Sequence, residues 1–307
     1  MKHLLIILSI FLSFTINSCS PYKDSSSSTT TPDTTTTDET TTTDSTTTDN
    51  TTTSSSDNSS SSVSVLFVGV GASGNIVRSN DNGASWDNAT SPTGNDFRGV
   101  GFGNNTFVAV GNNGNIVRST DNGSTWDNVT SPTTTNLSKV TFGNNTFLAV
   151  GNNGNIVRST DNGSSFDNAT SPTAIHLNGV TFGNNTFVGV DVSGNIVRST
   201  DNGSSFDNAT NSNASMLLGV TFGNNTFVGV GYSGNIVRST DNGSSWDNAT
   251  SPTDTHLYGV TFGNNTFVAV GLSGNIVRSS DNGSSWDNAT SPTSNHLYGV
   301  TGVTFSE

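Results

Sequence analysis

The sequence predicts an all-β protein: a six-bladed β-propeller of four-stranded antiparallel blades, closed by its C-terminal strand and preceded by a disordered tether. Two observations predict this fold. From Val63 onward the chain repeats itself every 40 residues, as the spacing of six aspartates shows: Asp81, Asp121, Asp161, Asp201, Asp241 and Asp281. Each repeat holds four short apolar stretches separated by turn residues, which is typical of one propeller blade. No stretch has the apolar periodicity of a helix.

The first 18 residues are expected to be a signal peptide. Lys2 and His3 give a weakly basic start, and the apolar run over residues 4–16 has the length of a secretory h-region but is too short to span a bilayer. The run ends in Ile16-Asn17-Ser18-Cys19, which resembles a bacterial lipobox with an acylated cysteine. Cys19 is the chain's only cysteine, so a disulfide framework is excluded. We expect a cell-envelope lipoprotein, anchored in the outer membrane and either surface-exposed or periplasmic.

Residues 19–62 form the predicted tether. After Cys19 this stretch consists almost entirely of Ser, Thr, Asp and Asn. Such a composition cannot bury enough apolar area to offset the entropy of ordering the chain. A coil of this length reaches on the order of 35 Å root-mean-square. We expect it to hold residues 63–307, the predicted propeller, away from a membrane.

The four predicted strands of a blade, named A to D from the inside outward, are seen clearly in one repeat: 97–102, 107–110, 116–119 and 126–130. The Asn-Asn and Asn-Gly turns between them supply the positive φ angles that two-residue hairpins require. The first repeat begins at strand B (66–70), and the chain ends after a further A strand (297–305). We predict that this last strand completes the first blade, which gives six blades and leaves no free sheet edge.

A repeated octapeptide within each blade resembles a known motif. Ser79-Asn80-Asp81-Asn82-Gly83-Ala84-Ser85-Trp86 and its five copies are similar to the Asp-box (BNR) repeat, Ser-x-Asp-x-Gly-x-Ser/Thr-Trp, with Phe166 and Phe206 in place of Trp in two copies. The resemblance covers residues 63–307. It points to a superfamily that includes sialidases, other glycosidases, sortilin-like receptors and the photosystem II assembly factors. It implies the propeller fold and says little about function, because the Asp box is itself a structural turn.

Two interactions are predicted around each Asp box. The aspartate is expected to accept backbone N–H bonds across its turn, and the aromatic residue to pack between neighbouring blades. The same register places an arginine opposite an aspartate in every blade, beginning with Arg78 and Asp87. We interpret these six arginines as members of cross-strand ion pairs rather than as a ring that binds an anion.

The repeats differ mainly in their B–C turns and D–A connections, which lie on one face of a four-stranded meander. Loops on a rigid scaffold commonly carry binding sites. With a closed ring, the candidate ligand-binding residues surround one mouth of the central channel: Asp96, Arg98, Tyr232, His256, Tyr258, His296 and Tyr298. Aromatic rings beside Arg, His and Asp suit a carbohydrate or a peptide. Two histidines and a carboxylate are also suitable metal ligands, but adjacent blades are expected to hold them apart, so we predict no metal.

The net charge and the types of residue present limit the possible function classes. The chain has 10 Lys and Arg against 23 Asp and Glu, with no basic cluster, which argues against a nucleic acid partner. Sialidases of this fold use an arginine triad and a Tyr–Glu nucleophile pair, whereas the only glutamates here are Glu39 and Glu307. Asp96 and Asp254 lie on non-adjacent blades, and no Ser/His/Asp arrangement has supporting spacing.

We therefore predict a monomeric, non-catalytic binding or scaffold module without a cofactor, whose partner is a carbohydrate or a protein at the cell surface. Its contact with the membrane is expected through the lipid anchor alone. Two alternatives stay open. One is a sialidase-like glycoside hydrolase, and the other is an extracytoplasmic assembly factor resembling the photosystem II group.

Overall fold

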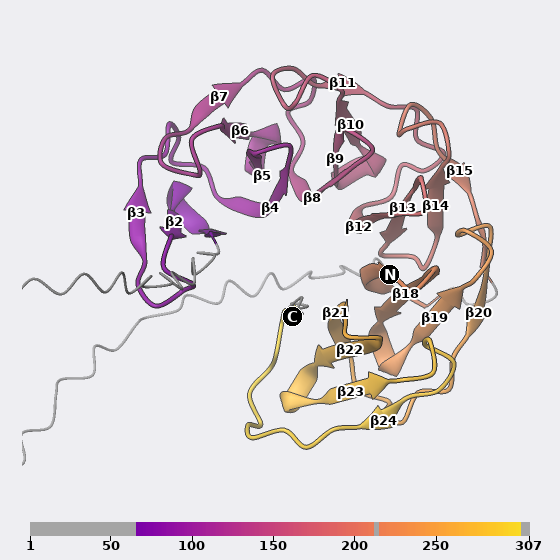
Figure 1. The fold of residues 1–307 in the computed structure, drawn as a ribbon. Coiled ribbons are helices and arrows are strands. Elements are labelled where there is room, and N and C mark those ends of the chain that lie inside the picture. The colour runs from indigo at the N-terminus through magenta and orange to yellow at the C-terminus, as the bar shows by residue number, and fades with distance from the viewer. Residues whose placement is uncertain (1–65, 212–214, 302–307) are drawn as a thin grey trace, which may run out of the picture. The chain divides into compact units, whose positions relative to one another are not determined.

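The computed structural model describes residues 66–211 and 215–301, which form six β-sheets arranged around a common axis (Figure 1). The predicted signal peptide (1–18), Cys19 and the predicted tether (19–62) lie outside the described residues. Within the described ranges, none of the helices has the length and apolar character needed to cross a bilayer.

The second sheet shows the plan of a blade. Its strands β4 (Phe97–Gly103), β5 (Thr106–Gly111), β6 (Ile116–Ser119) and β7 (Asp127–Val129) pair antiparallel in chain order. Each overlaps the stretch predicted for it.

The next four blades repeat this plan, and the fifth has an additional strand, β16 (Thr210–Asn211), that pairs parallel with β20. Their strands are β8 (Leu137–Gly143), β9 (Thr146–Gly151), β10 (Ile156–Ser159) and β11 (Asp167–Asn168); β12 (Leu177–Gly183), β13 (Thr186–Asp191), β14 (Ile196–Ser199) and β15 (Asp207–Asn208); β17 (Leu217–Gly223), β18 (Thr226–Gly231), β19 (Ile236–Ser239) and β20 (Ser245–Asn248); β21 (Leu257–Gly263), β22 (Thr266–Gly271), β23 (Ile276–Ser279) and β24 (Asp287–Asn288).

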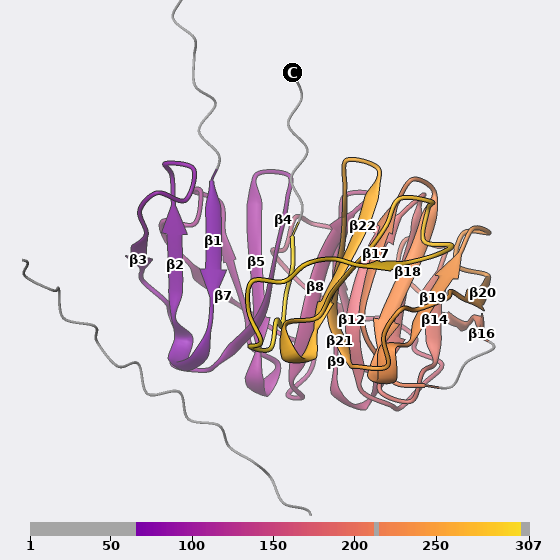
Figure 2. The same ribbon diagram turned by 90° about the horizontal axis from the view of Figure 1, so that it is seen from below.

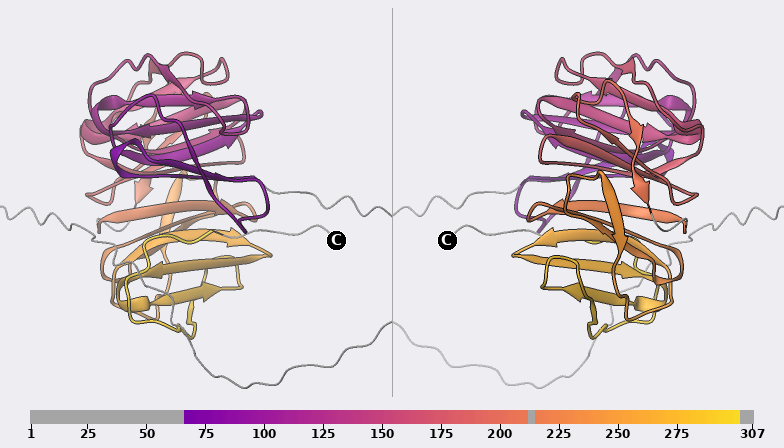
Figure 3. Two further views of the ribbon diagram at one scale, coloured as in Figure 1. Left: turned by 90° about the vertical axis from the view of Figure 1, so that its left-hand side faces the viewer. Right: turned by 90° about the vertical axis from the view of Figure 1, so that its right-hand side faces the viewer.

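The turns have the backbone angles that their asparagines and glycines predict. Asn104 and Asn105 between strands A and B have φ of 47° and 55°, and Asn82 and Gly83 between strands C and D have φ of 62° and 84°. Because both central residues have positive φ, the twist of the turn matches that of the flanking strands. Five of the six B–C turns contain short 3₁₀ segments: η1 (Ala72–Gly74), η2 (Asn112–Gly114), η3 (Asn152–Gly154), η4 (Tyr232–Gly234) and η5 (Leu272–Gly274). The side views show these turns gathered on two opposite faces (Figures 2 and 3).

The core lies between blades rather than within them. Strand B is buried along its whole length in blades two to five. Apolar clusters join neighbouring blades; in one of them Trp126 packs with Ile76 of the preceding blade and Phe107 of its own. The A strands line the axis and neighbouring A strands approach closely. A Cβ on Gly99, for example, would stand only 3.1 Å from the Cα of Lys139. Blade stability therefore depends on having a neighbour on each side.

The Asp boxes form the predicted turn. The Asp81 carboxylate accepts the Ser85 hydroxyl (2.6 Å), the Ser85 amide (3.0 Å) and the Ser79 hydroxyl (2.7 Å). These hydrogen bonds favour the ionised form, so they lower the pKa of Asp81 to about 2. The other five box aspartates also have a pKa of about 2; at Asp121, Asp161, Asp201 and Asp241 burial opposes the shift but the hydrogen bonds outweigh it.

The arginines have the predicted register but not the predicted partner. Arg118 and Asp127 are directly opposite, as in the other five blades. Within the described ranges, however, no ion pair joins these residues. The Arg118 Nε atom instead donates to the backbone oxygen of Asn162 in the next blade, at 2.8 Å, and the Arg78 Nη1 atom donates to the Ser124 hydroxyl of the next blade. The ion-pair interpretation was wrong, because an ion pair with an exposed Asp offers little stabilisation and the arginines extend into the partly buried interface with the next blade. Arg78 and Arg118 find acceptors there, whereas the buried Nε atoms of Arg158, Arg198 and Arg238 have no hydrogen-bond partner among the described residues.

The first blade differs from the prediction in one respect. Its sheet has three strands, β1 (Phe67–Val70), β2 (Ile76–Ser79) and β3 (Asp87–Ala89). Residues 297–301 belong to no strand and do not pair with β1, and the rest of the predicted closing strand lies outside the described residues. The sequence contains a reason. Gly302 stands at the repeat position of Phe262, whose ring packs on Phe267 of strand B with centroids 4.7 Å apart, so the C-terminal segment lacks the side chain that would make the same contact with Phe67.

Candidate functional site

The B–C turns and D–A connections meet on one side of the ring, which we call the variable face. At four B–C turns, a turn N–H donates to the side chain of the residue 23 positions further along the chain, which in three cases directly precedes strand A of the next blade. Ser73 donates to Asp96 Oδ1 (2.8 Å), Asn113 to Asn136 Oδ1 (2.9 Å), Ser233 to His256 Nδ1 (3.0 Å) and Ser273 to His296 Nδ1 (3.1 Å). Asp96, His256 and His296 therefore have a structural role as turn caps.

The fourth blade stabilises its B–C turn in a different way. Met216 stands at the capping position and has no oxygen or nitrogen acceptor in its side chain. Asp191 compensates at the end of β13, where other B strands end in glycine, and its buried carboxylate accepts the amides of Ser193 and Asn195, each at 2.8 Å. Asp191 thus stabilises a turn, and its bonded carboxylate gives no reason to assign it to catalysis.

Five aromatic side chains of the predicted set come together on the variable face. Tyr232 on η4 stacks on His256 with ring centroids 4.0 Å apart, and Tyr258 on β21 stacks on Tyr298 at 5.1 Å. His256 meets Tyr258 edge-on at 6.5 Å, and His296 meets Tyr298 edge-on at 6.1 Å. These five residues, Tyr232, His256, Tyr258, His296 and Tyr298, form one connected group that we call the aromatic cluster.

The backbone explains how the cluster forms. The N–H of Ser233 bonds to His256, which brings the neighbouring Tyr232 ring over the imidazole. Gly259 and Gly299 let the two chain segments approach, because a Cβ on Gly259 would stand 3.2 Å from the Cα of Gly299. Burial, followed by the charges that Tyr298 and Tyr232 would carry if ionised, raises the pKa of Tyr258. The hydroxyl of Tyr258 therefore remains a neutral hydrogen-bonding group at physiological pH.

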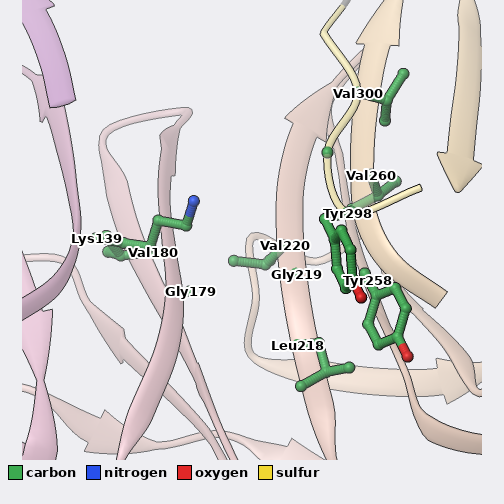
Figure 4. Close-up of a pocket in the computed structure, with 12 residues that line it drawn as sticks. Lys139, Gly179, Val180, Leu218, Gly219, Val220, Tyr258, Val260, Tyr298 and Val300 are labelled. Atoms are coloured by element: carbon green, nitrogen blue, oxygen red, sulfur yellow. The ribbon is translucent and has the colours of Figure 1, made fainter. Parts of the chain in front are cut away.

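The cluster borders a cavity of about 230 Å³ inside the ring. Its walls come from the A strands, with Lys139 of β8 on one side and Tyr258 and Tyr298 on the other (Figure 4). Leu218, Val220 and Val260 line the wall between them. Lys139 occupies a position that is glycine in every other repeat. The cavity therefore combines apolar walls, two phenol rings and one cation.

A second, polar group lies on the variable face. The Arg98 Nε atom donates to Asn112 Oδ1 (2.6 Å), and Asn112 Nδ2 donates to Asp96 Oδ2 (3.1 Å). Nearby, the Ser138 hydroxyl and His176 Nε2 are 2.8 Å apart. Burial, followed by the charge of Arg98, lowers the pKa of His176, so this imidazole is neutral at pH 7.

The structure thus divides the predicted set. Tyr232, His256, Tyr258, His296 and Tyr298 are brought together, whereas Asp96 and Arg98 belong to the polar group on the second blade. The predicted proximity of His296 to Asp96 depended on the C-terminal strand pairing with β1. Sequence reasoning missed Lys139, although its replacement of a repeated glycine was a signal, and it missed the Ser138–His176 contact.

The geometry supplies binding groups rather than reactive ones. No three His, Cys, Asp or Glu side chains lie together in a way that could hold a metal, within the part of the chain that the structure describes. Residues 66–301 contain no glutamate. Stacked, partly exposed phenols beside a cavity with both polar and apolar lining are instead typical of a surface that recognises a partner.

Comparison with known proteins identifies the fold of the chain as a β-propeller. A family model described as photosynthesis system II assembly factor YCF48 matches residues 65–305. No curated protein matches the chain.

Three solved structures illustrate the fold. The structure "YCF48 bound to D1 peptide" is 19% identical with a TM-score of 0.59, covering 72% of this chain and 76% of that one. YCF48 from Cyanidioschyzon merolae is 17% identical with a TM-score of 0.57, covering 74% and 85%. The WD40 propeller domain of Doa1 is 12% identical with a TM-score of 0.58, covering 76% and 80%. Identities this low show the fold alone, and they confirm the predicted propeller.

Proposed function

Because the chain belongs to the family of the photosynthesis system II assembly factor YCF48, we propose that it is a non-catalytic propeller that binds a protein partner, as an assembly or scaffold factor does. The observation that carries this proposal is the aromatic cluster. Tyr232 is 39% exposed and Tyr298 62% exposed, although both rings are already stacked on a neighbour. Preordered, solvent-facing tyrosines lose little entropy on binding and are frequent anchors of protein interfaces.

The partner segment that fits best is a peptide in an extended conformation. The cluster adjoins a cavity lined by phenol rings, aliphatic side chains and Lys139, so both apolar and polar side chains of a peptide would find contacts there. One relative in the family has been solved bound to a D1 peptide, which supports a protein segment rather than a sugar as the ligand class. Catalysis is not part of the proposal, since the Tyr–Glu pair of sialidases has no counterpart where Glu39 and Glu307 are the only glutamates.

The predicted anchor completes the proposal. We infer that Cys19 carries a lipid and that residues 19–62 hold the propeller at the bacterial cell envelope, where its partner would be extracytoplasmic. Changing Cys19→Ser should move the protein from the membrane fraction to the soluble fraction and abolish its labelling by a palmitate analogue. Retention of labelled protein in membranes after Cys19→Ser would contradict the anchor without affecting the binding proposal.

Binding is tested with peptide and glycan arrays probed in parallel. The variant Tyr258→Ala plus Tyr298→Ala should lose at least about thirtyfold in affinity for its best array peptide, because even one tyrosine anchor typically contributes about 2 kcal/mol. The matched control is Ser204→Ala plus Ser244→Ala on the opposite face, where Ala84 already occupies the same position of the first Asp box. Equal binding by both variants would place the site elsewhere. Binding to glycans alone would replace the peptide with a carbohydrate.

A further inference from the structure

The residues at the capping position of the B–C turns differ in their ability to take up a proton near neutral pH. In chain order they are Asp96, Asn136, His176, Met216, His256 and His296. An amide cap such as Asn136 does not titrate, whereas histidine is the side chain that ordinarily changes its charge between about pH 5 and pH 8. Within the described ranges, His256 and His296 are the only histidines that cap a turn, and both belong to the aromatic cluster.

The capping hydrogen bond requires a neutral imidazole. The Ser233 amide donates to His256 Nδ1 at 3.0 Å, and the Ser273 amide donates to His296 Nδ1 at 3.1 Å. A ring nitrogen that accepts an N–H carries a lone pair, so the single proton of each neutral ring is on Nε2. An imidazolium has a proton on both nitrogens, and turning the ring over only exchanges one N–H for the other. Protonation therefore removes the acceptor in either ring orientation.

The first of these caps holds Tyr232 in place. Tyr232 directly precedes Ser233 in η4, and its ring stacks on His256 with centroids 4.0 Å apart. The backbone oxygen of His256 also accepts the Leu272 amide at 2.9 Å, so this one residue links the B–C turns of the fifth and sixth blades. Loss of the cap at Ser233 would free the turn that carries Tyr232.

The second cap holds the chain that leads to Tyr298. His296 bonds the turn at Ser273, and the next residue, Leu297, donates its amide to Gly271 O at 2.9 Å. These two hydrogen bonds fix the chain just before the Tyr298 ring reaches its stacking partner at 5.1 Å. Loss of the cap at Ser273 would leave one of the two.

No ionised partner would compensate for an added proton. The titratable groups that face the two imidazoles are tyrosines: Tyr232, Tyr258 and Tyr298. Apart from the histidines, the turns 231–235 and 271–275, the connections 251–256 and 291–296, and the strands β17, β18, β21 and β22 contain one charged residue, Asp254. Asp254 is exposed, and within the described ranges it forms no ion pair with either histidine. Lys139 lies on the opposite wall of the cavity, where its positive charge would not stabilise an imidazolium (Figure 4). A charged ring at His256 would still attract the face of Tyr232, but that attraction supplies no acceptor for the Ser233 amide.

We propose that His256 and His296 make the aromatic cluster a pH-dependent docking site, which is ordered while both imidazoles are neutral and loosened when protonation removes the two caps. The partner is then held near neutral pH and released in an acidic environment. The effect on binding rests on the proposed function, whereas the loss of the caps does not require a partner. His256 and His296 act here as positioning residues for Tyr232 and Tyr298.

Peptide binding by the full chain is measured at about pH 8 and about pH 5, with an array peptide that contains no histidine and no acidic residue. The unmodified chain should bind at least about tenfold more weakly at the lower pH, because two turn amides lose their acceptors. The variant His256→Asn plus His296→Asn carries the cap that Asn136 provides in another blade. Its affinity should change by less than about twofold, because an amide oxygen does not titrate in this range. The variant retains His176, so a pH dependence that arises there would persist. An equal loss in both proteins, or no loss in either, overturns the proposal.

NMR on the unmodified, partner-free chain tests the caps without relying on a variant that must fold. Between about pH 8 and about pH 5, the amide proton resonances of Ser233 and Ser273 should move upfield as their acceptors are lost. The matched Asn113 amide, which is capped by Asn136, should stay in place. If the Ser233 and Ser273 resonances also stay in place, the proposal is overturned even for a chain that binds its peptide. If they move in a chain that binds no array peptide, the caps are confirmed and the proposed function alone is contradicted.

Discussion

The most demanding stability prediction concerns Trp246 in β20. Its indole is 2% exposed and packs against Val188 and Val190 of the preceding blade. It also contacts Phe227 with ring centroids 6.2 Å apart, and its Nε1 atom donates to Gly243 O at 3.1 Å. Trp246→Ala leaves a cavity between two blades that neither sheet can collapse to fill. We expect it to lower the free energy of unfolding by about 3–5 kcal/mol.

The chain provides its own matched control. Phe166 and Phe206 occupy the same position in two blades and are equally buried. Trp246→Phe should therefore cost only about 1–2 kcal/mol, since the packing is largely retained and one hydrogen bond is lost. The assay is urea unfolding followed by circular dichroism and by fluorescence, with coincident transitions required before free energies are compared. Equal losses in the free energy of unfolding for Trp246→Ala and Trp246→Phe would refute the claim that packing of this ring stabilises the contact between blades.

Three further outcomes are expected. Asp191→Gly should lower the free energy of unfolding by about 1–3 kcal/mol, because the Ser193 and Asn195 amides lose their buried acceptor. Adding Met216→His should recover part of this loss in urea unfolding, because a histidine at this position can cap the turn as His256 does. Thr186→Val should cost about 1–3 kcal/mol in the same assay, since it strands the Asn242 side-chain donor that lies 2.6 Å from the threonine hydroxyl, and a neutral effect would contradict the interface. The box aspartates have folded pKa values of about 2, below the ordinary 3.8, so their contribution to the stability of the fold is complete above pH 3.8 and is lost as the pH falls toward 2. Asp201→Asn should therefore make the acid unfolding transition less steep in a circular dichroism titration. An unchanged slope would argue against the role of the box.

The features that the sequence predicts well are those specified locally and then repeated. Asn104, Asn105 and Gly83 specify turn geometry through their own φ preferences, so strand number, order and pairing could be read from one repeat and confirmed in the others. The aromatic cluster was also accessible to sequence reasoning. Tyr258 and Tyr298 stand at one repeat position, and inner strands of adjacent repeats must be neighbours.

The features that sequence reasoning missed depend on contacts that strand register does not specify. Arg118 faces Asp127 in its own sheet yet bonds the backbone of Asn162 in the next one, a choice set by the depth of the interface rather than by register. The role of Asp191 depends on two amide donors in its own turn, which only backbone coordinates reveal. The C-terminal strand was judged by its repeat pattern, and pairing of its residues 297–301 with β1 is not formed in the structure.

The variable face is tested most directly by footprinting a bound peptide. Hydrogen exchange would be measured on the full chain with and without its best array peptide. Protection should fall on residues 232–233, 256–258 and 296–298, and should be absent from the turns at 184–185 and 224–225 on the opposite face. Protection confined to those opposite turns would contradict the proposal that this propeller binds its partner through the aromatic cluster.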